Sequence, residues 1–323
     1  MGGPLITKIA DNIISPLGFN SEENFKAVLS GKSMLRSYAA EFGLHEPFVG
    51  SRFNKHEIEG LLNNEIAENE DYTFFEKLCI VSAKKAIESC HLSAGESNVI
   101  FILSTTKGNI DYLEKTLEDP RCYLASSAQK IATYFGNHNT SIVVSNACIS
   151  GVCAQIAAVR ELLSGKYRYA VVIGCDVLSK FIISGFQSFK ALSTECCRPY
   201  DKDRIGLNLG EAVGTIILRS GNPSNEQGWH YVSSSIHNDA NHISGPSRTG
   251  EGSYRVLADI LKDVDANDIG FINAHGTATA YNDEMESIAI HRAGLDDICV
   301  NGLKGYYGHT LGAAGIIETI LSM

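Results

Sequence analysis

Short runs of β-branched and aliphatic residues alternate along this chain with longer stretches in which apolar residues recur at helical spacing. The short runs are typical of buried strands and the longer stretches of amphipathic helices, so their alternation predicts an α/β protein. Strands are predicted over residues 5–9, 98–103, 141–144, 169–174, 212–218, 230–236, 269–274 and 298–301. Helices are predicted over residues 21–30, 74–89, 125–134, 149–164, 253–261, 283–292 and 312–321.

The composition favours a soluble enzyme over a nucleic-acid-binding or membrane protein. Of the 323 residues 44% are hydrophobic, enough for one large core or two fused halves, and no apolar run is long enough to span a bilayer. The net charge of −10 argues against a nucleic-acid surface. The nine cysteines include no C-x-x-C pair or zinc-like spacing, so we expect neither a metal nor a cofactor. Without a signal-like N-terminal segment, so many cysteines indicate a reducing cytoplasm.

Cys148 has the sequence surroundings of a nucleophile. In the segment SNACISG it follows the predicted strand at residues 141–144 and precedes the predicted helix at residues 149–164. A cysteine at the first turn of a helix feels the positive end of the helix dipole and unpaired N–H groups, which favour the thiolate and can hold a developing oxyanion. The alternative is a small buried hydrophobic residue, the role expected of most of the nine cysteines.

Two further loops with reactive side chains follow predicted strands in the second half of the chain. His275 lies in NAHGTAT, and Lys304 and His309 lie in NGLKGYYGHTLGAAG. Glycine and small residues flank both histidines, an arrangement that gives up side-chain packing for close backbone approach. We therefore predict that both loops belong to a functional site.

With these three segments the chain resembles the β-ketoacyl synthases of the thiolase superfamily, and in particular their elongating, acyl-carrier-protein-dependent branch. Cys148 matches the acyl-accepting cysteine and His275 the first catalytic histidine. Lys304 and His309 match the family's lysine and second histidine at their usual five-residue spacing. The match continues in an Asn-Asp-x-x-Glu motif that contains Asp283 and Glu286, and in the segments RPYDKDR and LGEA before it.

The resemblance covers the chain from about Ile6 to Met323. It implies a thiolase-like fold of two similar βαβαβ-type halves stacked in α-β-α-β-α layers. The N-terminal half, residues 1–220, would carry the nucleophilic cysteine, and the C-terminal half, residues 221–323, both histidines. The division falls near residues 220–227, where Gly-Asn-Pro-Ser-Asn predicts a turn.

The residues suit a carbon–carbon bond made from two thioesters. A thiolate both attacks and leaves well, so Cys148 can hold the acyl group. The partner becomes a carbanion most easily when a malonyl thioester loses CO₂, and N–H groups of His275 and His309 can stabilise the enolate oxygen that develops.

Lys304 and the two acids are predicted to support the histidines. By resemblance Lys304 pairs with Glu286, and both hold the surroundings of the histidines in place. Asp283 is expected just outside the reacting groups. The alternative for Asp283 and Glu286 is that they are solvated charges at a helix start, where acidic residues are favoured.

The histidine pair distinguishes among related enzymes. Thiolases keep a second cysteine in the late loop, and initiating synthases have asparagine in place of one histidine, so His275 and His309 indicate a decarboxylating, elongating synthase. Chain-length-factor homologues lack the reactive cysteine that is present here.

The resemblance further implies a homodimer with residues 141–144 near the partner subunit. It also implies acyl carrier protein as the source of acyl and malonyl groups, in fatty acid, polyketide or aryl polyene synthesis.

Two features depart from the family. Residues 63–71 are acidic where bacterial synthases carry basic residues for the acidic carrier protein, although such acids also cap helix starts. If the carrier protein docks on another face, the candidate basic residues are Arg121, Lys130, Arg160, Lys166 and Arg168, on or near the Cys148 helix in sequence.

The second departure is that the resemblance stops at Met323, before the strand pair and Gly-Phe-Gly-Gly loop that supply a second oxyanion-hole N–H in relatives. We therefore expect weak condensation by these 323 residues alone. The competing hypothesis is a truncated, inactive or scaffold subunit of a synthase complex. Thiolase-like acyl transfer between other thioesters is a third.

Overall fold

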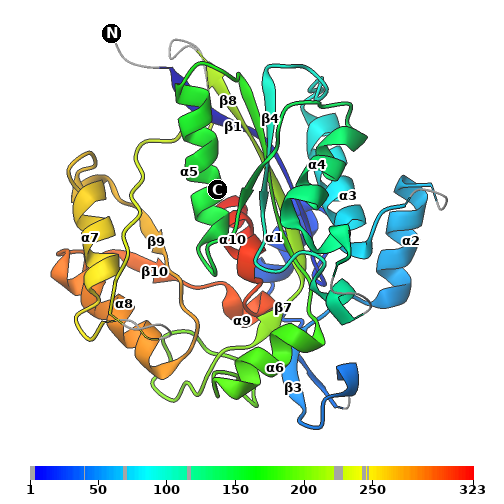
Figure 1. Cartoon of the computed structure of the whole chain (residues 1–323). Coiled ribbons are helices and arrows are strands. Elements are labelled where there is room, and N and C mark those ends of the chain that lie inside the picture. The colour runs from blue at the N-terminus through cyan, green and yellow to red at the C-terminus, as the bar shows by residue number, and fades with distance from the viewer. Residues whose placement is uncertain are drawn as a thin grey trace.

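The computed structural model of the chain describes residues 4–39, 41–67, 71–114, 118–221, 228–241, 245 and 247–323. Its largest element is a five-stranded sheet in the order β1-β8-β6-β4-β5 (Figure 1). The strands are β1 (Leu5–Ile14), β8 (Ala212–Gly221), β6 (Tyr169–Asp176), β4 (Val99–Ser104) and β5 (Ile142–Val144). β4 pairs parallel with β5 and β6, whereas β8 pairs antiparallel with β6 and β1. All five strands predicted before residue 220 are therefore confirmed.

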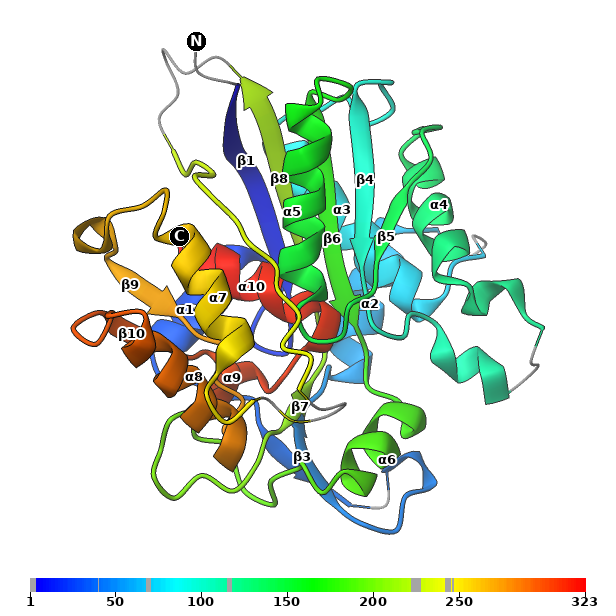
Figure 2. The ribbon, with the colours of Figure 1, turned by 60° about the vertical axis from the view of Figure 1, so that its left-hand side comes forward.

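Helices cover both faces of this sheet because its central strands are apolar on both sides. On one face lie α2 (Lys55–Glu65), α3 (Phe74–Ser89) and α4 (Leu124–Tyr134). On the other lie α5 (Ser150–Leu163) and α10 (Ala314–Leu321), which Figure 2 shows against the sheet, with α1 (Ser21–Leu29) beside them. A bulge between Lys8 and Ala10 shifts β1 by one residue, so Ile6 and Ala10 contribute to opposite cores.

The C-terminal part contains a much smaller sheet. β9 (Phe271–Asn273) and β10 (Cys299–Asn301) form a two-stranded parallel pair, with α7 (Glu251–Ile260) and α8 (Ala280–Arg292) packed together beyond it. From right to left in Figure 1, α3, the large sheet, α5 with α10, the small sheet, and α7 with α8 follow one another. This is the predicted α-β-α-β-α order of a thiolase-like fold.

One predicted strand is wrong. Residues 230–236 include the strand-favouring residues Tyr231, Val232 and Ile236, yet they make only an isolated bridge between His230 and Thr7. The N–H of Tyr231 donates to the carbonyl of Ile6 and the N–H of Lys8 to that of Trp229, and no further ladder forms in the described part of the chain. A segment with strand-favouring residues becomes a strand only where a neighbouring strand takes up its backbone hydrogen bonds.

Several short elements lay outside the sequence prediction. They are β2 (Arg36–Tyr38), β3 (Phe48–Ser51), α2, α6 (Lys180–Ser188), β7 (Leu209–Gly210) and α9 (Lys304–Tyr307). β2, β3 and β7 form a third sheet, which packs with α6 around a small apolar core. The predicted division at residues 220–227 falls mostly on residues 222–227, outside the described residues, and stays a prediction. Across the described ranges, no helix combines the length and apolar character needed to cross a bilayer.

The strand order determines where the functional loops meet. Ser104, the last residue of β4, lies beside Val144 of β5 and Gly174 of β6, so the loops after these parallel strands leave from one edge of the sheet. Asn273 and Asn301 are likewise paired at the ends of β9 and β10. In α/β folds such carboxyl-terminal strand edges carry the binding sites.

Candidate active site

Cys148 lies at a strained elbow between β5 and α5. Ala147 has a φ of 47°, in the left-handed region that non-glycine residues rarely adopt. The hydroxyl of Ser150 locks the turn, because it accepts the N–H of Asn146 at 2.7 Å and donates to the carbonyl of Ala147 at 2.6 Å. The predicted strand-to-helix elbow is therefore present, and it directs the Cys148 side chain into a cavity.

Two glycines bring this elbow close to α10. A Cβ on Gly151 would lie 2.9 Å from the backbone nitrogen of Ile316, and one on Gly315 would lie 2.7 Å from that of Val152. Only glycine allows two helices to approach this closely. The GAAG segment predicted as a site is thus the place where α10 crosses the start of α5.

The structure places Cys148, His275 and His309 together. One donor atom from each of the three side chains lies within 4.8 Å of the others. The imidazole rings of His275 and His309 meet edge to face with centroids 5.2 Å apart. His275 follows β9, whereas His309 follows α9, so two sequence-distant loops converge on the thiol.

His309 has a defined tautomer. The N–H of Leu311 donates to Nδ1 of His309 at 3.2 Å, so Nδ1 is unprotonated and Nε2 carries the hydrogen. The residue is fully buried, and its Nε2 has no hydrogen-bond partner among the described residues. A buried N–H without a partner, aimed at a thiol site, is suited to an oxygen that arrives with the substrate.

The same donor set was tested as a metal site. A thiolate and two imidazoles are ligands that Zn²⁺ accepts. A metal on Nε2 of His309 would require the hydrogen to move to Nδ1, where it would face the N–H of Leu311. The hydrogen bonding of His309 therefore fits a hydrogen-bond donor better than a metal ligand.

Burial keeps these groups uncharged. It lowers the pKa of His275 to about 3 and that of His309 well below its ordinary value, and the Lys304 ammonium acts in the same direction. Burial also raises the pKa of the Cys148 thiol, although the Lys304 ammonium opposes this shift. The backbone N–H at the helix start also favours the thiolate, but desolvation is the larger effect, so the net pKa of Cys148 lies above its ordinary value.

Lys304 is buried between the two histidine loops, with 2% of its surface exposed. Its ammonium donates to Glu318 Oε1 at 2.7 Å and to the carbonyl of His275 at 2.5 Å. The expected pairing of Lys304 with Glu286 is therefore wrong, and the carboxylate comes from α10 instead. The sequence signal for Glu318 was its position as a lone acid in an otherwise apolar helix, where an unpaired carboxylate would be costly.

Glu286 and Asp283 hold the backbone of the His275 loop. Glu286 accepts the N–H of His275 at 2.6 Å and that of Gly276 at 3.0 Å. Asp283 is 1% exposed and accepts the N–H of Ala278 at 3.1 Å. The alternative of freely solvated charges at a helix start is wrong for both, since each carboxylate is used by the loop that precedes α8.

Asp176 holds the backbone of the His309 loop, as Glu286 and Asp283 hold that of the His275 loop. This role of Asp176 was not identified from the sequence. Its carboxylate accepts the N–H of Gly312 at 2.7 Å, the N–H of Thr106 at 2.9 Å and the hydroxyl of Thr105 at 2.9 Å. Burial raises the pKa of Asp176, and these hydrogen bonds oppose the shift. The N–H of His309 donates to the carbonyl of Asn208 at 2.6 Å, which fixes the loop from the other side.

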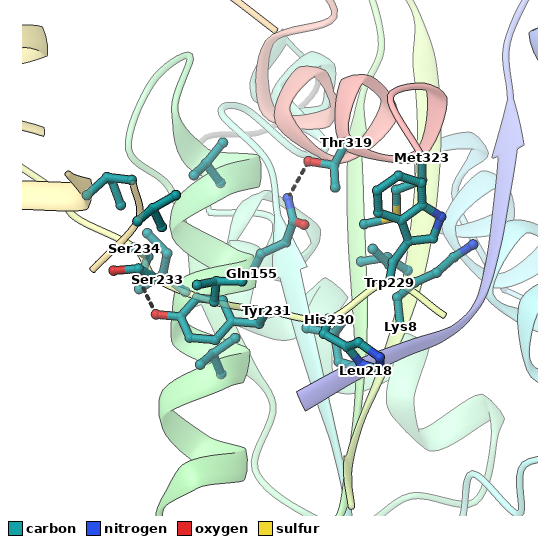
Figure 3. Close-up of a pocket in the computed structure, with 17 residues that line it drawn as sticks. Lys8, Gln155, Leu218, Trp229, His230, Tyr231, Ser233, Ser234, Thr319 and Met323 are labelled. Carbon is teal, nitrogen blue, oxygen red and sulfur yellow. Dashed lines mark hydrogen bonds between the residues drawn. The ribbon is translucent and has the colours of Figure 1, made fainter. Parts of the chain in front are cut away.

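Two cavities of about 430 Å³ each lie along this face of the molecule. The first contains Cys148 and His275. The second is mainly apolar and lies along α5 beneath the segment that contains Trp229 and Tyr231 (Figure 3). Figure 3 shows Gln155 donating to Thr319 at the edge of the second cavity, at 3.2 Å. Both cavities are lined by Val152, Trp229, Thr319 and Met323.

Comparison with known proteins gives a consistent picture. The β-ketoacyl synthase N-terminal domain matches residues 9–223, and the β-ketoacyl synthase C-terminal domain matches residues 230–323. A 3-oxoacyl-[acyl-carrier-protein] synthase 2 from Vibrio cholerae serotype O1 is 27% identical, over 96% of this chain and 83% of its own length. Nodulation protein E from Rhizobium leguminosarum bv. trifolii is 28% identical, over 76% of this chain and 68% of its own length.

Solved structures share the fold. A ketosynthase from Xenorhabdus doucetiae, determined in complex with its chain length factor, superposes with a TM-score of 0.82 at 24% identity, over 98% of this chain and 82% of that one. A β-ketoacyl synthase from Burkholderia phymatum STM815 superposes with a TM-score of 0.80 at 21% identity, over 99% of this chain and 85% of that one. Since the first domain alone accounts for more than half of the sequence, the chain belongs to the β-ketoacyl synthase family.

Proposed function

We propose that this β-ketoacyl synthase joins an acyl group carried on Cys148 to a malonyl thioester by decarboxylative Claisen condensation. The observation that carries the proposal is the convergence of one thiol and two uncharged imidazoles within 4.8 Å. A thiol is needed to hold the acyl group, and neutral N–H donors are needed where negative charge develops on oxygen.

Acyl transfer comes first. The sulfur of Cys148 attacks the carbonyl carbon of the incoming thioester, and the carrier thiol leaves with the proton that Cys148 gives up. The raised pKa of Cys148 means that the proton departs as the bond forms rather than beforehand. The Lys304 ammonium lowers the cost of charge on sulfur during this step.

Decarboxylation and condensation follow. The malonyl thioester loses CO₂, and the electron pair moves into an enolate whose oxygen accepts N–H groups of His275 and His309. The enolate carbon then attacks the acyl carbon on Cys148, the new carbon–carbon bond forms and the carbon–sulfur bond breaks. The sulfur leaves as a thiolate and takes a proton from solvent. Because both histidines are neutral, they act as hydrogen-bond donors and need not gain or lose a proton.

The proposed donor of both groups is an acyl carrier protein, which relatives named 3-oxoacyl-[acyl-carrier-protein] synthase support. Arg121 and Lys130 are weak candidates for its docking surface, because Asp119 and Glu76 already lie 2.7 and 3.4 Å from their charged groups. Arg160, Lys166 and Arg168 remain the proposed basic contacts.

We also propose a cytoplasmic homodimer whose subunits meet at β5. In the described residues β5 pairs only with β4, so its other edge is available to a partner strand.

The alternative of an inactive scaffold subunit is less well supported, because the thiol and both imidazoles are present and converge.

Labelling with an acyl thioester, followed by peptide mass spectrometry, tests the central assignment. We expect the adduct on Cys148, and a loss of condensation of about 10⁴-fold or more in Cys148→Ala. Cys153→Ala is the matched control, since Cys153 is a buried cysteine in the first turns of α5, close to Cys148 in sequence. An adduct on Cys153 or Cys175 with none on Cys148 would contradict the assignment.

A further inference from the structure

We propose that Tyr200 is a positioning residue for His275, acting through the carboxylate of Glu286 in the decarboxylation step. The inference rests on the function proposed above. Tyr200 makes no hydrogen bond or ring contact with the thiol or either imidazole among the described residues. The inference follows from three contacts of its own.

The first contact is a short hydrogen bond. The phenol of Tyr200 donates to Glu286 Oε2 at 2.6 Å. The same carboxylate accepts the backbone N–H groups of His275 and Gly276. Among the described residues Glu286 has no ion-pair partner, so its charge is stabilised by these three donors alone.

The second contact is through the backbone. Tyr200 has a φ of 63°, a strained conformation for a residue with a bulky side chain. Such strain persists only where the surroundings enforce it. Here the N–H of Tyr200 donates to Asp283 Oδ2 at 2.8 Å, so main chain and side chain of one residue engage both acids of α8.

The third contact is between the ring and the loop. A Cβ on Gly276 would lie 3.2 Å from Cε2 of Tyr200, so the backbone next to His275 rests on the tyrosine ring. Gly276 has a φ of 46°, which glycine adopts without strain. The ring therefore limits movement of the loop at Gly276.

The hydroxyl stays a donor throughout the working pH range. Burial, and then the charge of Glu286, raise the pKa of Tyr200 well above its ordinary value. A phenylalanine would keep the ring contact and lose only the hydrogen bond, leaving the carboxylate with two donors. Loosened in this way, Glu286 would hold the His275 backbone less firmly, and the imidazole would be less well placed for the enolate oxygen.

Tyr200→Phe separates positioning from general stability. We expect kcat for decarboxylation of a malonyl-carrier thioester to fall about 10-fold, as for loss of a hydrogen bond to a charged group. The KM for that thioester and the rate of Cys148 acylation should change less than about twofold, because neither depends on His275. Tyr254→Phe is the matched control, since it also removes one tyrosine hydroxyl, from a ring on α7 that packs against the Arg292 guanidinium 4.0 Å away.

A double-mutant cycle with Glu286→Gln shows whether Tyr200 acts through the carboxylate. In the Glu286→Gln background, Tyr200→Phe should have less than a twofold effect on decarboxylation. The same loss of activity in both backgrounds, an unchanged kcat in Tyr200→Phe, or equal losses of acylation and decarboxylation would each overturn the inference. If Tyr200→Phe fails to fold, Glu286→Gln alone must slow decarboxylation selectively. An unmutated protein that neither acylates Cys148 nor decarboxylates malonyl thioester refutes the proposed function instead.

Discussion

Cys148 and His275 approach each other from two parts of the molecule that are built differently. Cys148 follows a strand of the five-stranded sheet, which is covered by helices on both faces and buries most of its side chains. His275 follows a two-stranded sheet whose Phe271 and Val300 are 42% and 41% exposed. The nucleophile is thus held by packing and a local turn, whereas the histidine has little packed sheet behind it.

On the C-terminal side of the site, hydrogen bonds to acidic and basic side chains hold the His275 loop, where apolar packing holds the Cys148 elbow. The His275 loop donates backbone N–H groups to the carboxylates of Glu286 and Asp283. It accepts a hydrogen bond from the Lys304 ammonium, which in turn donates to Glu318. Hydrogen bonds to charged groups are directional and fix a backbone position that a small apolar contact area would leave loose. The comparison therefore predicts that the two sides respond differently to mutation and to pH.

The largest effect should come from breaking the buried pair of Lys304 and Glu318. Glu318→Ala leaves the ammonium buried with one carbonyl acceptor, and we expect unfolding free energy to fall by about 3–5 kcal/mol in urea titrations. The double variant Lys304→Met with Glu318→Met should be more stable than Glu318→Ala, because no charge is left unpaired. A loss below about 1 kcal/mol for Glu318→Ala would mean that water or another group takes over the role of the carboxylate.

The next effect should separate the two chemical steps. His309→Ala removes the buried N–H donor, and we expect malonyl decarboxylation to slow by about 10²–10³-fold, the cost of one oxyanion donor. Acylation of Cys148, followed by mass spectrometry, should change much less. His291→Ala is the control, because His291 is exposed and pairs with Asp296 on the surface. Equal losses in both steps would place His309 in acyl transfer as well.

A smaller effect should follow from crowding the helix crossing on the nucleophile side. Gly315→Ala introduces a Cβ 2.7 Å from the nitrogen of Val152, and we expect a loss of about 1–3 kcal/mol in stability together with slower acylation. Gly60→Ala in α2 is the control, since a Cβ there meets nothing within 4 Å and alanine favours the helix. If Gly315→Ala has no more effect than Gly60→Ala, close approach of α5 and α10 is not what holds the elbow.

What the sequence predicted, and what it did not, follows the same division. The elbow at Cys148 and the five strands of the large sheet could be predicted from local sequence patterns, namely apolar runs followed by small residues. The partners of the C-terminal loops are not local. Glu318 and Asp176 reach their loops only through tertiary packing, and nothing in the spacing around Lys304 indicates a carboxylate on α10 rather than on α8.

The predicted strand at residues 230–236 failed for a related reason. It contains residues that favour strands, namely Tyr231, Val232 and Ile236, but Val232 and Ile236 are 70% and 41% exposed, and a strand also requires a neighbour. Periodicity describes which face of a segment is apolar, and only the assembled sheet decides whether backbone partners are available. Sequence patterns are therefore most reliable where both requirements are met within one compact core.

The smallest expected effect is on the pH dependence of decarboxylation. Since the folded protein holds the pKa of His275 near 3 and that of His309 well below its ordinary value, both rings stay neutral between pH 5 and 8. The decarboxylation rate should vary by less than about twofold over this range, in contrast to a free imidazole, which titrates near pH 6.5. A rate that falls on acidification with an apparent pKa near 6.5 would show that one imidazole is accessible to protons, and that the histidine side is looser than its hydrogen bonds indicate.

The pH dependence of folding stability also tests whether His275 is shielded from protons. Its direction follows from the lowered pKa of His275 in the folded protein. Below about pH 6.5 the unfolded chain binds a proton on His275 before the folded protein does, so stability is lost as the pH falls toward about 3. The raised pKa values of Asp176, Glu211 and Glu318 act in the opposite sense, because the folded protein takes up those protons first as the pH falls. The difference between the unmutated protein and His275→Gln isolates the histidine, and this difference should decline from pH 7 to pH 4. A constant difference would mean that the His275 pKa is unshifted, and that the hydrogen-bonded loop does not exclude water as the packed sheet beside Cys148 does.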